Sequence, residues 1–166
     1  CRNSDWFMLI NHGAKRSGKT QLDNDLFLAE LRKVRQMADQ LGIDTPQYIL
    51  AGYSLGNIQD NILTELSNKY GFEFKFDKTN GFGAYINEAS LANQEVFDEI
   101  KARCSGKGAR IIADTNPDHP EHWLLKDYIK SGASGILSNH FSLDDNTFLD
   151  ERYVREIKAT TPKGMF

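Results

Sequence analysis

An eight-residue run, Gly13 to Thr20, constrains the fold of this chain more than any other feature of its sequence. The run, GAKRSGKT, matches the pattern GxxxxGK[ST]. It follows an apolar segment at 6–10 that predicts a buried strand, and it precedes an amphipathic segment at 22–41 that predicts a helix. A glycine-rich turn between a strand and a helix directs backbone N–H groups and the positive end of the helix dipole at one point. The sequence therefore predicts a phosphate-binding loop on an α/β scaffold.

We expect this loop to hold a nucleoside triphosphate. The Lys19 amine would reach the β- and γ-phosphates, and the Thr20 hydroxyl would bind Mg²⁺. The alternative interpretation is a basic glycine turn without a ligand, but the flanking strand and helix favour the functional one. The expected nucleotide-binding residues are Gly13, Ala14, Lys15, Arg16, Ser17, Gly18, Lys19 and Thr20.

Composition limits the classes to which the chain can belong. Its 166 residues fit one domain with a sizeable core, and 40% apolar and 26% charged residues are typical of a globular protein. A net charge of −3 provides no overall electrostatic attraction to nucleic acid, and no apolar run approaches the ~20 residues that span a bilayer. Cys1 and Cys104 form no disulfide framework, which indicates a reducing compartment. Because both ends lack a polar tail, we expect a domain cut from a longer protein.

Strand and helix patterns alternate along the chain, which predicts a mostly parallel sheet with helices on both faces. The expected strands are Trp6–Asn11, Gln47–Tyr53, Phe72–Asp77, Phe82–Asn87, Ala109–Asp114 and Gly135–Phe141. The expected helices are Gly18–Leu41, Leu55–Tyr70, Asn93–Arg103, Glu121–Ser131 and Phe148–Ala159.

The four residues 78–81 are too short a link for a parallel pair, which needs a crossover of about a dozen residues. Either 72–77 and 82–87 form an antiparallel hairpin with a turn at Asn80 and Gly81, or residues are missing between 77 and 83.

The expected strand at 82–87 ends in Asn87, and Glu88 follows it directly. Ligands of an open α/β sheet lie beyond the carboxyl ends of its strands, which places these two residues beside Lys19 and Thr20. Glu88 would orient or deprotonate the attacking water, and Asn87 would contact Mg²⁺ through water. The alternative is a strand that ends with a solvated acid.

The next expected strand ends at Asp114 and is followed by Thr115 and Asn116. These small polar side chains fit two interpretations. They could sense the γ-phosphate and pass its presence to the following helix, or they could form an Asx-type turn before Pro117.

Several segments resemble the ATPase domain of the large terminase subunit of tailed bacteriophages. They are Gly13–Thr20, Ala84–Asn93, Arg103–Gly106, Asn116–Leu124, His140–Asn146 and Phe148–Leu149, and the Asn116–Leu124 stretch is the most specific of them. This resemblance implies a RecA-like, three-layer phosphate-loop NTPase (ASCE-type) that hydrolyses ATP with Mg²⁺ to move DNA. In that family a separate nuclease domain follows, so no nuclease activity is expected in 1–166.

The resemblance also assigns roles to individual positions. It makes Glu88 the catalytic glutamate, and Thr115 with Asn116 the motif that couples hydrolysis to DNA movement. The family often has an arginine at the third loop position, where this chain has Lys15 followed by Arg16, so either could stabilise transferred charge. Asn87 stands where the family has an aspartate, and an amide oxygen is a weaker metal ligand than a carboxylate.

The expected partners are double-stranded DNA, a portal protein and a small terminase subunit, with a homo-oligomeric ring in the motor and a monomer in isolation. The expected location is the cytoplasm of an infected bacterium, outside the mature virion. Two alternatives remain: a nucleotide-binding assembly module with little turnover, and a helicase-like or recombinase-like ATPase.

Other clusters have simpler interpretations. His119 and His122, with Asp114 and Asp118 nearby, could bind a metal, but helix capping is favoured because structural zinc prefers four N/S ligands. Asp144, Asp145, Asp150 and Glu151 fit helix caps better than a two-metal nuclease site. Trp6 and Phe7 fit a core better than an adenine stack, and the basic residues at 32–35 and 101–110 fit solvated surfaces better than a DNA-binding patch.

Overall fold

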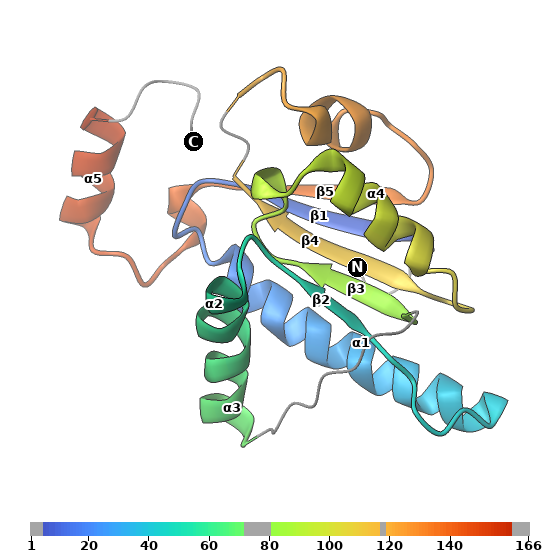
Figure 1. Cartoon of the computed structure of the whole chain (residues 1–166). Coiled ribbons are helices and arrows are strands. Elements are labelled where there is room, and N and C mark those ends of the chain that lie inside the picture. The colour runs from blue at the N-terminus through green and yellow to red at the C-terminus, as the bar shows by residue number, and fades with distance from the viewer. Residues whose placement is uncertain (1–4, 72–80, 117–118, 161–166) are drawn as a thin grey trace.

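The computed structural model describes residues 5–71, 81–116 and 119–160, and a central sheet lies between two layers of helices (Figure 1). The strand order is β2-β3-β4-β1-β5, and every neighbouring pair is parallel. This confirms the predicted three-layer α/β fold. The strands are β1 (Met8–Gly13), β2 (Ile49–Ala51), β3 (Gly83–Ile86), β4 (Arg110–Thr115) and β5 (Ile136–Phe141).

The helices follow the strands in the predicted alternation. A 23-residue helix, α1, follows the loop, and a continuous helical stretch between β2 and β3 contains a π-helical segment, η1. The elements are α1 (Lys19–Leu41), α2 (Leu55–Ile58), η1 (Gln59–Leu63), α3 (Thr64–Tyr70), η2 (Ala89–Leu91), α4 (Gln94–Arg103), η3 (Leu124–Ile129), η4 (Leu143–Asp145) and α5 (Glu151–Thr160).

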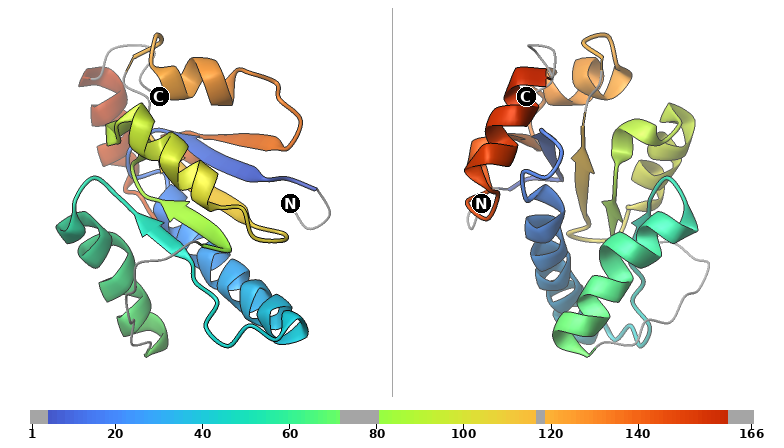
Figure 2. Two further views of the ribbon diagram at one scale, coloured as in Figure 1. Left: turned by 45° about the vertical axis from the view of Figure 1, so that its right-hand side comes forward. Right: turned by 90° about the vertical axis from the view of Figure 1, so that its left-hand side faces the viewer.

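Alternate residues of the inner strands build two separate cores, one on each face of the sheet. Met8 and Ile10 of β1 point into a core that α4 and η3 cover, together with Phe97 and Leu124. Leu9, between them, points into the other core, which α1 and the α2–α3 stretch cover. Figure 2 shows these helices on opposite sides of the sheet. Because both faces are covered, β1 and β4 each carry three consecutive apolar residues, Met8–Ile10 and Ile111–Ala113, before their polar carboxyl ends.

Some predicted bounds differ from the structure. The strand expected at 47–53 is only Ile49–Ala51, since β2 is, among the described strands, an edge strand that pairs with β3. The helix expected at 121–131 is confined to Leu124–Ile129 and is π-helical. The last helix starts at Glu151 rather than Phe148, because Asp150 accepts hydrogen bonds from the backbone N–H groups of Arg152 and Tyr153 and so caps it.

The expected strand at 72–77 and most of the short link at 78–81 lie outside the described residues. The strand expected at 82–87 is β3, which pairs in parallel with β2 on one side and with β4 on the other. The suggestion that residues are missing between 77 and 83 stays a prediction.

Candidate nucleotide site

The carboxyl ends of β1, β3 and β4 meet at one edge of the sheet, and the Gly13–Thr20 loop lies there. Gly13 has φ +133°, and a Cβ atom at this position would lie 1.9 Å from the Phe141 carbonyl oxygen, so only glycine fits between β1 and β5. Arg16 (φ 62°) and Gly18 (φ 88°) adopt left-handed conformations, and α1 begins directly afterwards at Lys19. This backbone shape forms the concave, N–H-rich nest that the sequence predicts.

Lys19 lies at the centre of the loop and is 6% exposed. Its amine donates to the carbonyl oxygens of Gly13 (3.2 Å) and Ala14 (2.6 Å), to Ser17 Oγ (3.2 Å) and to Asn116 Oδ1 (2.8 Å). Burial lowers the pKa of the Lys19 amine, while the nearby carboxylates of Asp114 and Asp23 oppose this shift. Neutral oxygen acceptors therefore fix the position of the amine, and a phosphate oxygen can replace them.

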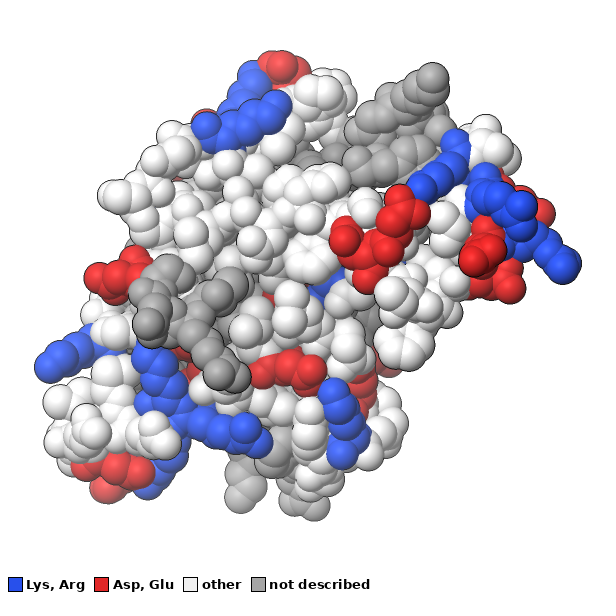
Figure 3. All heavy atoms as spheres, turned by 180° about the vertical axis from the view of Figure 1, so that it is seen from behind, with Lys and Arg blue, Asp and Glu red and all other residues white. Residues whose placement is uncertain are grey.

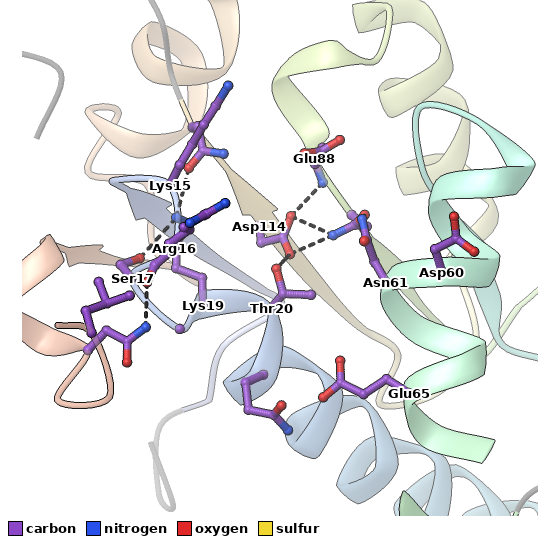
Figure 4. Close-up of a pocket in the computed structure, with 16 residues that line it drawn as sticks. Lys15, Arg16, Ser17, Lys19, Thr20, Asp60, Asn61, Glu65, Glu88 and Asp114 are labelled. Carbon is purple, nitrogen blue, oxygen red and sulfur yellow. Dashed lines mark hydrogen bonds between the residues drawn. The ribbon is translucent and has the colours of Figure 1, made fainter. Parts of the chain in front are cut away.

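Asp114, at the end of β4, is 3% exposed and accepts four kinds of hydrogen bond. Three side-chain groups donate to its Oδ2: Thr20 Oγ1 at 3.2 Å, Tyr85 Oη at 3.3 Å and Asn87 Nδ2 at 2.9 Å. The backbone N–H of Glu88 donates to its Oδ1 at 2.5 Å. Figure 4 shows Thr20 and Glu88 on either side of Asp114. Burial raises the pKa of Asp114, against these hydrogen bonds and the Lys19 charge.

Glu88 and Arg16 are the two non-glycine residues with positive φ in the described parts of the chain, and both line the same pocket. Glu88 has φ 54° and ψ 50°, directly after β3. Its carboxylate accepts a hydrogen bond of 2.9 Å from Asn57 Nδ2 at the start of α2. Backbone strain of this kind concentrates at functional sites, because the surrounding structure must hold it in place.

Thr115 and Asn116 connect the site to the segment after Glu88. Thr115 Oγ1 accepts from the backbone N–H of Ser90 (3.1 Å), and the Asn116 carbonyl accepts from Ser90 Oγ (3.3 Å). A ring nitrogen of His122, just before η3, lies 3.1 Å from the Ser90 carbonyl oxygen. The ends of β3 and β4 are thus joined to each other and to the following helix.

Lys15 and Arg16 form the outer rim of the loop. Asn146 Nδ2 donates to the Arg16 carbonyl oxygen at 2.6 Å, and the Arg16 guanidinium lies 5.3 Å from the centre of the Tyr153 ring of α5. The segment after β5 therefore holds the far side of the loop. Together these groups enclose a pocket of about 640 Å³, within the range of small-ligand sites.

The predicted site residues that line this pocket are 15–20, Asn87, Glu88 and Asn116. Gly13 and Ala14 lie behind it, where their carbonyl oxygens accept from Lys19, and Thr115 contacts Ser90 instead of the pocket. Sequence reasoning missed Asp114 as the central acid, and it missed the contributions of Asn57, Asn61, Tyr85 and Ser90. Asp114 had a signal, since it follows an apolar run, but the sequence placed it only near a possible histidine metal cluster and at a strand end that fits a phosphate sensor or a turn. The asparagines of α2 and η1 carry no motif.

The donor set beside the loop fits Mg²⁺. A threonine hydroxyl and a carboxylate lie 3.2 Å apart, and both are hard oxygen ligands of the kind that Mg²⁺ prefers. The hydroxyl donates its proton to Asp114, so the lone pairs of the Thr20 oxygen remain available to a cation.

The other clusters have structural partners. Trp6 is buried, with the Arg110 guanidinium 4.3 Å from its ring centre, as the core interpretation predicts, but that interpretation is wrong for Phe7, which is 37% exposed. His122 Nδ1 accepts from the backbone N–H of Leu124, the first residue of η3, as the capping interpretation predicts, whereas His119 Nδ1 accepts from Glu121 in the turn before the helix. Asp145 completes a capping box with Ser142.

Two of the basic residues on α1 are paired with acids: Lys33 lies 3.5 Å from Glu30, and Arg35 lies 2.7 Å from Asp39. On the face seen in Figure 3, blue and red side chains are interspersed. Within the described residues, no helix is long and apolar enough to span a bilayer.

Comparison with known proteins gives the family. The model of the phage terminase large subunit matches residues 78–163, which is more than half of the chain. The chain belongs to the phage terminase large subunit family. The matched segment of this terminase sequence includes Asn87, Glu88, Asp114 and Asn116, outside the phosphate loop. No curated protein matches the sequence.

Solved terminase structures share the fold. The large terminase of a thermophilic bacteriophage in complex with ATP-gamma-S has a TM-score of 0.76 and 20% identity, covering 96% of this chain and 45% of that one. The ADP complex of the same thermophilic phage terminase has a TM-score of 0.75 and 20% identity, with coverages of 96% and 46%. The HK97 bacteriophage large terminase has a TM-score of 0.53 and 15% identity, with coverages of 90% and 37%. The present terminase chain spans less than half the length of these proteins.

Proposed function

We propose that this chain is the ATP-hydrolysing domain of a phage DNA-packaging motor, which moves double-stranded DNA into a procapsid. One observation carries the proposal: the phosphate loop of β1 and the strained Glu88 of β3 line the same pocket, in a chain of the terminase family. The large terminase of the thermophilic bacteriophage was solved with ATP-gamma-S and with ADP, which supports ATP as the nucleotide.

In this mechanism the loop amides and Lys19 hold the β- and γ-phosphates, and Thr20 binds Mg²⁺. The metal, when bound, neutralises charge on the phosphates. Glu88 accepts a proton from the attacking water or orients it, after its carboxylate leaves Asn57. Lys15 or Arg16 adds positive charge at the transferred phosphoryl group.

Asn116 gives a physical basis for coupling. Its side-chain oxygen accepts from Lys19, the same amine that the γ-phosphate requires. A bound triphosphate therefore competes with Asn116, and the displaced segment can pass the change through Ser90 to His122 and η3. Thr115 and Asn116 are thus proposed as the coupling residues.

The proposed partners are double-stranded DNA, a portal protein and a small terminase subunit, in a ring of copies that assembles in the cytoplasm of the infected bacterium. No nuclease activity is proposed for residues 1–166. The alternative of an assembly module with little turnover is favoured by one observation, the amide of Asn87 where an acid is usual.

A packaging assay tests the proposal. The protein, portal-bearing procapsids, linear DNA and ATP are mixed, and DNA protected from added nuclease is measured. Glu88→Gln should abolish protection while ADP binding remains, and the exposed control Glu95→Gln should package normally. Normal packaging by Glu88→Gln would remove Glu88 from the mechanism, and ATP binding without hydrolysis in the unaltered protein would favour the assembly module.

A further inference from the structure

The carboxylate closest to the loop threonine comes from β4 rather than from β3. Thr20 Oγ1 donates to Asp114 Oδ2 at 3.2 Å. The sheet order explains this contact: β4 lies between β3 and β1, so its carboxyl end is one strand nearer to the loop. A side chain at the end of β3 must reach across β4 to contact Thr20.

Asn87, at the end of β3, faces Asp114 with its amide nitrogen. Nδ2 donates to both carboxylate oxygens, at 2.9 and 3.2 Å, and Oδ1 accepts from Asn61 Nδ2 of η1 at 3.1 Å. With its oxygen engaged by Asn61, Asn87 acts as a hydrogen-bond donor that fixes Asp114. It is 1% exposed, so this orientation is held by packing on all sides.

The remaining contacts of Asp114 are also neutral donors: the Tyr85 hydroxyl, the Glu88 backbone N–H and the Thr20 hydroxyl. Lys19, the nearby cation, is directed instead at carbonyl, hydroxyl and amide oxygens. A buried carboxylate is costly unless a positive partner balances it. The cluster is therefore an oxygen site, fixed from four directions, that a cation beside Thr20 would complete.

We propose that Asp114 supplies the carboxylate of the Mg²⁺ site in this chain and that Asn87 is its positioning residue. The acidic function has moved from the end of β3 to the end of β4, and the amide left on β3 holds the displaced carboxylate. This inference rests on the proposed nucleotide-binding function. The amide of Asn87 then no longer argues for an assembly module with little turnover, because the carboxylate that the metal needs is supplied by Asp114 of β4.

Mn²⁺ in place of Mg²⁺ allows a direct test by electron paramagnetic resonance. The affinity of the protein–ADP complex for Mn²⁺ is measured for the unaltered protein, Asp114→Asn, Asn87→Ala and Asp60→Asn. The last is the matched control, because Asp60 lies on the opposite wall of the same pocket (Figure 4). ADP affinity in the presence of a chelator is measured in parallel.

Asp114→Asn should weaken Mn²⁺ binding by about tenfold or more, Asn87→Ala by a smaller factor, and Asp60→Asn by less than about twofold. ADP affinity without metal should stay near that of the unaltered protein in all three. Unchanged Mn²⁺ affinity in Asp114→Asn, or a larger loss in Asn87→Ala than in Asp114→Asn, would overturn the inference.

Two further arrangements keep the outcome decisive. If Asp114→Asn does not fold, Asp114→Ser takes its place, since serine is smaller and still accepts hydrogen bonds from Asn87 and Glu88, and the same loss is expected. If the unaltered protein binds no ADP, the proposed function fails; if it binds ADP and the variants keep full Mn²⁺ affinity, only the assignment of Asp114 fails.

Discussion

At the scale of single residues, the site depends on polar groups buried beneath the loop. Asp23, in the first turns of α1, is fully buried. Asn11 of β1 donates to its Oδ1, and its Oδ2 has no hydrogen-bond partner among the described residues. Asn139 of β5 donates in turn to Asn11 at 2.9 Å. These hydrogen bonds connect α1, β1 and β5 behind the phosphate loop. A carboxyl group with one unpartnered oxygen in such surroundings is most stable when it is neutral.

The pKa of Asp23 is raised to about 8, first by burial and then by the charge of Asp114, while Asn11 and Lys19 oppose the shift. The folded protein therefore binds more protons here than the unfolded chain between about pH 4 and pH 8. Because a raised pKa stabilises the fold only while the group is protonated, the free energy of unfolding should fall across this range, by at most about 1.4 kcal/mol per pH unit.

Asp23→Asn should reduce this fall, and urea unfolding at pH 5 and pH 8 measures it. Asp39→Asn, an exposed change later in α1, should keep the pH dependence of the unaltered protein. The same dependence in Asp23→Asn as in the unaltered protein would contradict a neutral, buried Asp23.

At the scale of elements, the approach of β5 to β1 shapes the loop. Gly13 ends β1 with its Cα facing the Phe141 carbonyl, which also accepts the Ala14 backbone N–H at 2.9 Å. The loop thus starts from a fixed strand pair rather than from a free turn. Its other end, Gly18, also has a positive φ, but nothing lies within 4 Å of a Cβ atom built there.

These two glycines form a matched pair for substitution. Gly13→Ala should lower the free energy of unfolding by about 3 kcal/mol or more. The new Cβ atom would force the Phe141 carbonyl to move, and alanine would also have to adopt a positive φ. Gly18→Ala should cost only about 1–2 kcal/mol, the penalty of the left-handed backbone. Urea unfolding midpoints check both, and equal losses would show that packing against β5 does not shape the loop.

The sequence predicts an element well where the residues that determine it are close together in the chain. The loop, α1 and the alternation of β1, β4 and β5 follow from apolar periodicity and glycine placement. The position of Asp114 against Thr20 could not be predicted in this way, because the two residues are 94 positions apart and meet only through the strand order. The π-helical segments η1 and η3 likewise carry no sequence pattern that separates them from α-helix.

The predicted role of Asn87 shows the same limit. Its position at the end of β3 was predicted, but its orientation depends on Asn61 and Asp114, which come from two other elements. The left-handed backbone of Glu88 also follows from tertiary contacts, since glutamate does not favour it intrinsically. The sequence thus indicated which strand ends form the site, and the fold determines which atoms face the ligand.

At the scale of the whole molecule, the pocket joins groups that are far apart in the sequence. The chain between β1 and α1 supplies the loop, Glu88 follows β3, Asp114 lies in β4 with Asn116 directly after it, and the segment after β5 closes the rim with Asn146. The α2–η1 stretch contacts both Glu88 and Asn87 through Asn57 and Asn61. A phosphate bound in this pocket can therefore affect helices on both faces of the sheet, which fits the proposed coupling.

The most direct test of this account is single-turnover hydrolysis of ATP in the presence of Mg²⁺, with the unaltered protein, Glu88→Gln and the exposed control Glu95→Gln. The account predicts that Glu88→Gln binds ATP normally but hydrolyses it about 10²- to 10⁴-fold more slowly, while Glu95→Gln matches the unaltered protein. Hydrolysis by Glu88→Gln at the rate of the unaltered protein would contradict it.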